Sequence, residues 1–352
     1  MVLAIEWRDI DQPTLRLIDQ TALPHEERYL DVRSVDDLVR AINELSVRGA
    51  PALGAAGALG VAIAMNQAVR EGWHDARLQS EVQRIRDARP TAINLAWGVD
   101  QVRGAMPHGV SEVLRLAHEL VAEDTEANRT LSRVGADWIL KRTGLDHVRV
   151  ITHCNTGALA TTAWGTAYGI IHELHDRGNL GLVYADETRP LLQGARLTSW
   201  ELQQDGIAHV VQADGAASST ILRGLVDVAI IGADRITANG DAANKIGSVA
   251  LALACARAGI PFIVAAPSST VDLSTKRGED IVIEERPSDE VVNFNGRRSA
   301  PEGVMGFNPA FDVTPHDLIT AIVTERGVVE PAAHPDPELL ASIARREGSR
   351  SQ

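Results

Sequence analysis

Four short, mainly aliphatic runs follow Gly144, and segments long enough to form helices separate them. The runs are VRVIT (148–152), GLVYA (181–185), VDVAIIG (226–232) and PFIVAA (261–266). Strands that alternate with helix-length segments imply a parallel sheet with crossover helices. In such a sheet a ligand binds at the carboxyl ends of the strands. We therefore expect the functional site in the loops that follow the first three runs.

The first part of the chain shows helical spacing instead. Residues 34–44 (SVDDLVRAINE) begin with a capping serine, carry acids in the first turn and place aliphatic residues on one face. Similar spacing recurs in 78–86, in 95–106 and from 111 past 120. We predict an α/β protein with a mainly helical N-terminal domain over 1–145 and a parallel-sheet domain over 146–352.

Two local signals predict further helix starts. Residues 198–201 (TSWE) have the pattern of a capping box, and Gly206 would close the helix that it opens. Thr314 followed by Pro315 combines a cap with proline at the first helical position.

Charge limits the classes of partner. Acidic residues outnumber basic residues by 47 to 34, which gives a formal net charge of -13. No block of Lys and Arg could neutralise a nucleic-acid backbone, so we expect no nucleic-acid partner. A small phosphorylated substrate remains compatible, because one pocket can be cationic in an acidic protein.

Cysteine content and hydrophobic patterning indicate a cytoplasmic, soluble chain. Two cysteines are too few for a disulfide framework or a thiolate zinc site. Charged residues interrupt the first segment, MVLAIEWRDID, which does not resemble a secretory signal. The uncharged stretch 49–69 is long enough to cross a bilayer, but it is mainly Ala and Gly with few large aliphatic residues. We expect it to form a helix of a soluble protein, with no membrane contact.

Cys154 stands after the first aliphatic run, where Asn155, Thr156 and Gly157 would present backbone amides at the start of a helix. Such amides and the helix dipole favour the thiolate, the nucleophilic and basic form of cysteine. The alternative is a structural cysteine, small and partly apolar. That alternative fits Cys255, which lies inside the helical run SVALALACARA.

Asp234 occupies the equivalent place after the third run. A carboxyl group in a partly dry cleft at the sheet edge would keep its proton near neutrality and could donate it. The alternatives are a helix cap or an ion pair with Arg235. The pair of Cys154 and Asp234, each after an apolar strand, is more informative than either residue alone.

A phosphate-binding segment is predicted at RGAPA (48–52), where a guanidinium precedes an Ala-rich helix. Free amides and a positive helix end suit a phosphate, and Arg48 adds a bidentate charge. An ordinary turn into a close-packed helix is the alternative. Further candidates in loops expected to face the same cleft are Arg89, Gln193, Asn244 and Lys245.

No motif calls for a metal or a nucleotide. The HELH sequence at 172–175 is one residue short of a zinc-protease motif, so its two histidines cannot share a helix face. The chain has no GxGxxG after a strand and no GxxxxGK[ST]. We expect neither a metal nor a cofactor.

Six segments in order along nearly the whole chain carry a family resemblance: SVRGAPALG (46–54), ARPTAINLAW (88–97), THCNTGALAT (152–161), DETRPLLQGARLTSWEL (186–202), GADRITANGDAANKIGS (232–248) and NPAFDVTPHDLI (308–319). Together they closely resemble the methylthioribose-1-phosphate isomerase family. Its superfamily includes ribose-1,5-bisphosphate isomerases and regulatory subunits of the guanine-nucleotide exchange factor of translation initiation. The resemblance implies a Rossmann-like C-terminal domain after a helical N-terminal one. One departure is Tyr184-Ala185-Asp186 ahead of ETRP, where a different strand end is expected.

The resemblance also implies roles for the candidate residues. Cys154 and Asp234 would form the catalytic pair, and the substrate-binding residues would be Arg48, Gly49, Ala50, Arg89, Gln193, Asn244 and Lys245. The implied reaction converts an aldose 1-phosphate into a ketose 1-phosphate in methionine salvage, so the substrate is a small sugar phosphate. Asp234 would donate a proton for ring opening. Cys154 would act at C2 as a base, or stabilise the transition state of a hydride shift.

Two other functions remain as alternatives. A noncatalytic regulatory subunit would not need a Cys and an Asp at paired strand ends. An isomerase of ribose 1,5-bisphosphate or 5-deoxyribose 1-phosphate would differ only in pocket shape. RGAPA followed by HCNTG is closer to the methylthioribose enzyme than to the bisphosphate enzyme, whereas no motif excludes the deoxyribose phosphate. From the resemblance and from Ala-rich helices whose faces need covering, we also expect a homodimer.

Overall fold

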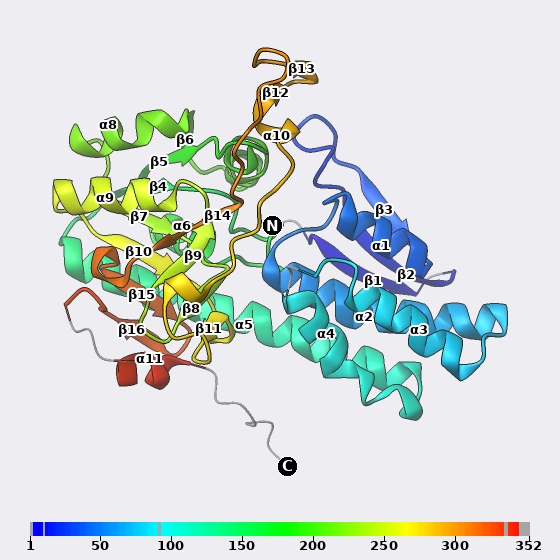
Figure 1. Ribbon diagram of the computed structural model, residues 1–352. Coiled ribbons are helices and arrows are strands. Elements are labelled where there is room, and N and C mark those ends of the chain that lie inside the picture. The colour runs from blue at the N-terminus through cyan, green and yellow to red at the C-terminus, as the bar shows by residue number, and fades with distance from the viewer. Residues whose placement is uncertain (1–2, 10, 91–92, 334–336, 345–352) are drawn as a thin grey trace. The chain divides into compact units, whose positions relative to one another are not determined.

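The structure is a computed structural model that describes residues 3–9, 11–90, 93–333 and 337–344. Packing divides the chain into two compact units (Figure 1). The first comprises Met1–Glu126 and Thr156–Gly165, and the second comprises Ala127–Asn155 and Thr166–Gln352. The domain boundary expected near residue 145 stays a prediction. In the division by packing, the chain first passes from one unit to the other between Glu126 and Ala127.

The first unit opens with a three-stranded antiparallel sheet that the sequence patterns did not predict. Its strands are β1 (Ile5–Asp9), β2 (Pro13–Ile18) and β3 (Tyr29–Val32), in that order. Leu15 and Leu17 of the central strand are fully buried. Their spacing of two residues places both on one face of the sheet.

Helices make up the rest of this unit, as predicted. They are α1 (Val35–Asn43), α2 (Ala50–Glu71), α3 (Asp75–Arg86), α4 (Ile93–Arg103), η1 (Met106–His108) and the first part of α5 (Val110–Thr143). The Ser34 side chain accepts a hydrogen bond from the Asp37 backbone N–H, which confirms the predicted cap of α1. Thr91 and Ala92 of the ARPTAINLAW motif lie outside the described residues.

Helix α2 is the apolar stretch that is long enough to cross a bilayer, and 83% of its most apolar window is buried inside the structure. It packs against α1, α3, α4 and β2. Glycines bring its backbone into direct contact with α4: a Cβ on Gly57 would lie 2.6 Å from the Leu95 carbonyl oxygen, and one on Gly98 would overlap the Gly54 carbonyl oxygen. In this structure α2 is a core helix, as expected.

The second unit is built on a seven-stranded sheet in the order β16-β15-β10-β7-β4-β5-β6. The strands are β4 (Val148–Thr152), β5 (Leu180–Asp186), β6 (His209–Gln212), β7 (Val228–Ile231), β10 (Phe262–Ala265), β15 (Ala321–Thr324) and the antiparallel β16 (Gly327–Val329). All four strands expected from the aliphatic runs are confirmed. Read from β6 to β15, this is the 3-2-1-4-5-6 order of Rossmann folds, whose strand order reverses between β4 and β7.

Helices cover both faces of this sheet (Figure 1). Val148 and Val150 of β4 belong to the core formed with the second part of α5, α6 (Ala167–Asp176) and α7 (Ser199–Gln204). Ile151 points to the opposite core, formed with α8 (Ala217–Leu222), α9 (Ser248–Ala258) and α11 (Pro337–Ile343). Both faces of the strands are therefore buried, which explains their nearly continuous apolar sequences.

A small second sheet replaces the loop expected after the third aliphatic run. Its order is β11-β8-β9-β14, with β8 at Arg235–Thr237, β9 at Ala242–Lys245, β11 at Val271–Asp272 and β14 at Phe311–Thr314. The predicted helix start at Thr314 is wrong, because Thr314 ends β14. Pro315 then precedes only a short 3-10 turn, η6 (His316–Leu318).

The remaining elements are short. The 3-10 turns are η3 (Asp214–Ala216), η4 (Ser268–Thr270) and η5 (Gly278–Asp280). Helix α10 (Asp289–Val292) leads into a hairpin of β12 (Asn293–Phe294) and β13 (Arg297–Arg298), which projects from the second unit (Figure 1).

Candidate active site

Cys154 and Asp234 follow the two neighbouring strands at which the strand order reverses. Strands β4 and β7 run parallel, with Thr152 paired to Ile230. Cys154 is two residues beyond the end of β4, and Asp234 is three residues beyond the end of β7. Both residues therefore emerge at the carboxyl edge, at the switch point where open α/β sheets bind ligands.

The backbone of Cys154 is held in an unusual conformation. Its φ angle is 66°, a left-handed value that non-glycine residues avoid by about 1–2 kcal/mol. The Cys154 N–H donates to the Thr188 hydroxyl oxygen at 2.8 Å, and the Thr198 hydroxyl donates to the Cys154 carbonyl oxygen at 2.6 Å. Two threonines from the segment after β5 thus fix the strand end that carries the buried cysteine.

The segment after β5 is itself strained and tightly bound. Thr188 has a φ of 63°, and its backbone N–H and that of Arg189 each donate to Asp214 at 2.7 Å. A π-helix follows at Gly194–Thr198, where a Cβ on Gly194 would overlap the Asp186 carbonyl oxygen. Strained backbones and π-helical turns concentrate at functional sites. This segment therefore marks the carboxyl edge as a candidate active site.

The helix predicted from residues 198–201 is present as α7, and Gly206, with a φ of 70°, follows its end, but the predicted capping box is wrong. Thr198 has helical φ and ψ angles of -63° and -45°, and its side chain makes no cap hydrogen bond. Besides binding the Cys154 carbonyl, its hydroxyl accepts from Asn155 Nδ2 at 3.3 Å. Glu201 accepts from the same Asn155 nitrogen at 2.5 Å. Both side chains bind the segment after β4 instead of capping α7.

The surroundings of Asp234 differ from expectation. Its side chain is exposed, so the dry cleft predicted from the apolar strand does not surround it in this structure. Its backbone N–H donates to the Ala243 carbonyl oxygen at 2.9 Å. Arg235 forms its ion pair with Asp272 at 3.7 Å. Asp234 stands at a turn between β7 and β8 and does not cap a helix.

Three predicted substrate-binding residues belong to the second unit. Gln193 is buried just before the π-helix, and its Oε1 accepts no hydrogen bond within the described residues. Asn244 ends up buried near the start of α9, where its Nδ2 donates to Ser248 at 2.9 Å. Lys245 Nζ donates to the Ala310 carbonyl oxygen at 2.8 Å and lies 4.1 Å from the centroid of the Phe311 ring.

The other four predicted residues belong to the first unit. Arg48 and Arg89 are half-buried, and Gly49 caps α2 with a φ of 97°. A Cβ on Gly49 would overlap the Ala160 carbonyl oxygen, so the close approach also requires glycine. Ala50 begins the helix. The amide of Ala52, two residues on, donates to Ala160 at 3.4 Å, so the α2 start offers fewer open amides than expected.

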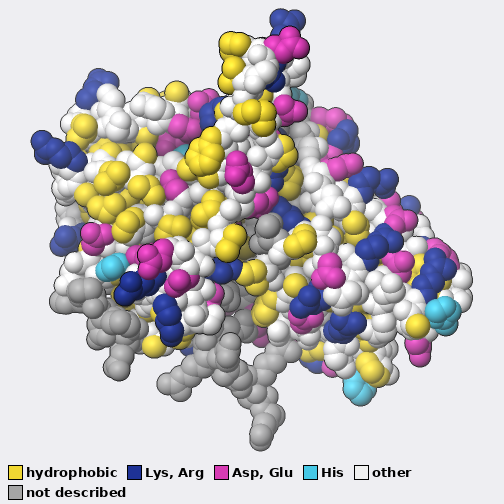
Figure 2. Space-filling model, viewed as in Figure 1, with side chains coloured by type: hydrophobic (Ala, Val, Ile, Leu, Met, Phe, Trp, Pro, Cys, Tyr) yellow, Lys and Arg dark blue, Asp and Glu magenta, His cyan; other side chains and the backbone are white. Residues whose placement is uncertain are grey.

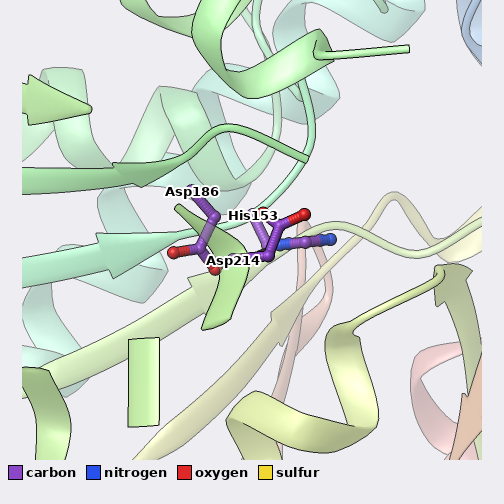
Figure 3. A group of neighbouring side chains, drawn as sticks. All are labelled: His153, Asp186 and Asp214. Carbon is purple, nitrogen blue, oxygen red and sulfur yellow. Dashed lines mark hydrogen bonds and ion pairs between the residues drawn. The ribbon is translucent and has the colours of Figure 1, made fainter. Parts of the chain in front are cut away.

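Sequence reasoning missed a buried histidine beside the candidate cysteine. His153 is 1% exposed, and Figure 3 shows it with Asp186 and Asp214. His153 Nδ1 lies 3.1 Å from Asp186 Oδ2, and Nε2 lies 2.8 Å from the Ile246 carbonyl oxygen. The sequence offered two signals for this site. His153 is a polar residue between an aliphatic strand and a candidate cysteine, and Asp186 is an acid at the end of the next strand.

These three side chains have the composition of a metal site, with ligand atoms within 4.8 Å of one another. Their hydrogen bonds argue against that function. Both ring nitrogens of His153 face oxygen acceptors, whereas a metal ligand must offer a free nitrogen lone pair. Asp214 already accepts two backbone N–H groups. The group is better described as a hydrogen-bonded cluster that organises the site.

Known proteins are similar to this chain over almost its full length. The sequence matches the initiation factor 2 subunit family over residues 46–331. A methylthioribose-1-phosphate isomerase of Anaeromyxobacter dehalogenans is 50% identical over 93% of this chain and 93% of its own. A probable bifunctional methylthioribose-1-phosphate isomerase/methylthioribulose-1-phosphate dehydratase of Nocardia farcinica is 49% identical over 96% of this chain, which spans 61% of that longer relative.

Two solved structures share the fold. The 5-methylthioribose 1-phosphate isomerase of Pyrococcus horikoshii has a TM-score of 0.86 and 37% identity, over 97% of this chain and 96% of its own. A protein described as the translation initiation factor eIF-2B, subunit delta, of A. fulgidus has a TM-score of 0.85 and 40% identity, over 97% and 100%. The chain therefore belongs to the initiation factor 2 subunit family and, within it, to the group of methylthioribose-1-phosphate isomerases.

Proposed function

We propose that this chain is an aldose–ketose isomerase that converts 5-methylthioribose 1-phosphate into 5-methylthioribulose 1-phosphate in methionine salvage. The observation that carries the proposal is the placement of Cys154 and Asp234 beyond β4 and β7, the two strands at the switch point. The names of relatives that are about half identical to the chain agree with it.

The chemistry needs an acid and a group that acts at C2. The phosphate on C1 blocks simple opening to a free aldehyde, so the bond between C1 and the ring oxygen must break while that oxygen gains a proton. Asp234 supplies this proton. Because Asp234 is exposed, the bound substrate itself must exclude water from the carboxyl group.

Two routes move hydrogen from C2 to C1. In the first, the Cys154 thiolate removes the C2 proton, the electron pair forms the C1–C2 double bond of an enol, and C1 is then protonated as O2 loses its proton. In the second, hydride passes directly from C2 to C1, O2 loses its proton to leave the C2 ketone, and Cys154 stabilises the transition state. Turnover in D2O distinguishes them, because only the first route brings solvent deuterium to C1.

Substitution of the catalytic pair tests the proposal. Cys154→Ser and Asp234→Asn keep the shape of each side chain and remove its ionisable group, so each should lower kcat by orders of magnitude. Arg48→Ala should first raise KM, because it removes a phosphate-binding charge. If both variants of the pair keep more than about a tenth of wild-type turnover, they contribute less than about 1.4 kcal/mol to the barrier and the assignment is wrong.

The substrate-binding assignments rest on charge and hydrogen-bonding capacity. We assign the phosphate to Arg48, Gly49, Ala50 and Arg89, and we assign further substrate contacts to Gln193, Asn244 and Lys245. The buried Gln193 Oε1 is an acceptor for a sugar hydroxyl. Because no step calls for a metal, dialysis against a chelator should leave turnover unchanged, and activity restored by zinc or magnesium would contradict this.

A regulatory, noncatalytic function is the second candidate, favoured by the 40% identity to the structure described as an initiation factor subunit. Assays of the purified chain with 5-methylthioribose 1-phosphate, 5-deoxyribose 1-phosphate and ribose 1,5-bisphosphate separate the candidates. A high kcat/KM for the first compound supports the proposal. Turnover of none of the three supports the regulatory function.

We further propose that the protein is cytoplasmic and a homodimer. Figure 2 shows hydrophobic side chains gathered on the face that carries α8 and α9. Leu222 of α8 and Leu253 of α9 are exposed, and so are Val210 and Val211 of the edge strand β6. Such a patch beside an open sheet edge suits a subunit contact. A monomer mass by light scattering at micromolar concentration would refute the dimer.

A further inference from the structure

His153 joins the two segments that carry the proposed chemistry and the proposed substrate contacts. It lies between the last residue of β4 and Cys154. Its Nε2 reaches the carbonyl oxygen of Ile246, the residue after Lys245 in the turn from β9 to α9. Its Nδ1 reaches Asp186 at the end of β5. One buried ring thus connects three chain segments at the carboxyl edge.

The partners of the ring determine its protonation. A carbonyl oxygen has no proton to donate, so Nε2 must carry the hydrogen of its bond to Ile246. Asp186 accepts from Gln212 Nε2 at 2.9 Å through its other oxygen. Burial raises the pKa of Asp186 above its ordinary value, although the hydrogen bond with His153 opposes this shift. The contact between Nδ1 and Asp186 Oδ2 also needs one proton, and placing this proton on the ring makes an imidazolium that uses both N–H groups.

The surrounding charges support the cationic form. Burial alone lowers the pKa of His153, but the hydrogen bond to Asp186 and the charges of Asp186 and Asp214 raise it above the ordinary value. Asp312 on β14 adds a third nearby carboxyl group, and it accepts from the backbone N–H of Gly247 at 2.8 Å. The carboxyl groups facing the ring thus come from β5, η3 and β14.

Gly247 gives the ring its space. A Cβ at this position would lie 2.8 Å from His153 Cε1 and 2.9 Å from Nε2, and the φ of Gly247 is 109°. Only a residue without a side chain lets the ring reach the Ile246 carbonyl. The contact between the His153 ring and the Ile246 carbonyl therefore depends on both His153 and Gly247.

We propose that His153 is a positioning residue of the isomerase, which acts as a buried imidazolium that fixes the Cys154 strand end relative to the turn carrying Asn244 and Lys245. This inference rests on the proposed function, because those residues are its catalytic and substrate-binding groups. His153 itself takes no part in proton transfer, since hydrogen bonds to Asp186 and Ile246 occupy both of its nitrogens.

Nuclear magnetic resonance of the full chain, labelled with 15N in histidine, tests the protonation directly. We expect one ring with both nitrogens protonated at pH 7.5, a signal that disappears in His153→Gln. In Asp186→Asn the same ring should carry a single proton. A neutral His153 ring in the wild-type protein overturns the proposal. This measurement does not depend on which sugar phosphate the enzyme isomerises.

Kinetics test the positioning role. A displacement of about 1 Å can lower turnover about 100-fold, so we expect kcat/KM of His153→Gln to fall by roughly that factor. Asp186→Asn and Gly247→Ala keep the imidazole but disturb it from outside, and each should lower kcat/KM at least about tenfold. These two variants keep the test open if His153→Gln does not fold.

His316→Gln provides the matched control. It breaks another histidine–aspartate contact, 2.9 Å to Asp241, in the 3-10 turn that follows β14. Its kcat/KM should stay within about twofold of wild type. If folded His153→Gln is equally active and only melts at a lower temperature, His153 is merely structural and the proposal is wrong. If the wild-type protein turns over no sugar phosphate, the proposed function fails, while the resonance test of His153 still stands.

Discussion

Replacement of Thr188 by valine tests how much the Thr188 hydroxyl group, one of two that bind the Cys154 backbone, holds its strained conformation. Thr188 is fully buried, accepts the Cys154 N–H at 2.8 Å and donates to the Asp186 carbonyl oxygen at 3.0 Å. Valine keeps the shape of threonine and removes both hydrogen bonds. The Cys154 N–H is then left without its acceptor.

The expected loss of stability follows from these contacts. An orphaned buried donor costs about 1–3 kcal/mol, and the second lost hydrogen bond adds about 0.5–1.5 kcal/mol. We therefore expect the free energy of unfolding to fall by about 1.5–4.5 kcal/mol. The left-handed conformation of Cys154 would lose one of its two threonine contacts, so kcat should fall more than stability alone explains.

Denaturant unfolding of the full chain, followed by circular dichroism, measures the first effect, and steady-state kinetics on the folded variant measures the second. Thr188→Ser is the matched control, because it keeps the hydroxyl group and removes only the methyl group. Serine should retain most of the activity. If valine and serine unfold at the same denaturant concentration and turn over at the same rate, the hydroxyl does not hold Cys154 and the reasoning is refuted.

Three further predictions concern other parts of the chain. Gly49→Ala should destabilise the protein by about 2–4 kcal/mol, because alanine meets both an unfavourable φ and a close backbone oxygen. Gly72 has a φ of 67° but open space around it, so Gly72→Ala should cost only about 1–2 kcal/mol when both variants are compared by thermal unfolding. Burial alone would raise the pKa of Asp227, but hydrogen bonds from Arg149 hold this pKa below its ordinary value. The ionised carboxylate therefore stabilises the folded state above about pH 3.9, and this stabilisation is lost as the pH falls through the folded pKa. Asp227→Asn should therefore be less stable than wild type at pH 7, and the difference should shrink as the pH falls below about 3.9; a difference that stays constant as the pH falls would contradict the assignment. Burial raises the pKa of the Cys255 thiol to about 12, so iodoacetamide at pH 8 should leave Cys255 unmodified in the native protein and label it after denaturation, as peptide mapping by mass spectrometry would show.

The main sheet was predictable because its strands are buried on both faces. Continuous aliphatic runs such as VRVIT then mark a strand without reference to any other part of the chain. Placement of Cys154 and Asp234 at one edge follows from the same information. Their neighbouring positions in the strand order needed the resemblance or the structure.

The small sheet and the threonine contacts were not predictable from local patterns. Strand β9 pairs Lys245 with Phe311, far along the chain, and its four residues carry no alternation of their own. Thr198 and Glu201 have the spacing of a capping box, but partners near Cys154 take both side chains. Local spacing indicates what a side chain could bind, while the distant partner decides what it does bind.

Added apolar side-chain atoms usually stabilise a protein core, but at the close glycine contacts between α2 and α4 they would destabilise it. A buried Leu or Ile loses about 0.5–1 kcal/mol of rotamer entropy on folding, whereas Ala and Gly lose none. The 22-residue α2, rich in Ala and Gly, thus orders little besides its backbone, and attraction between closely packed main chains replaces large side chains. Enlarging Gly57 or Gly98 would add hydrophobic surface and yet separate the two helices. In this layer, greater side-chain volume means lower stability.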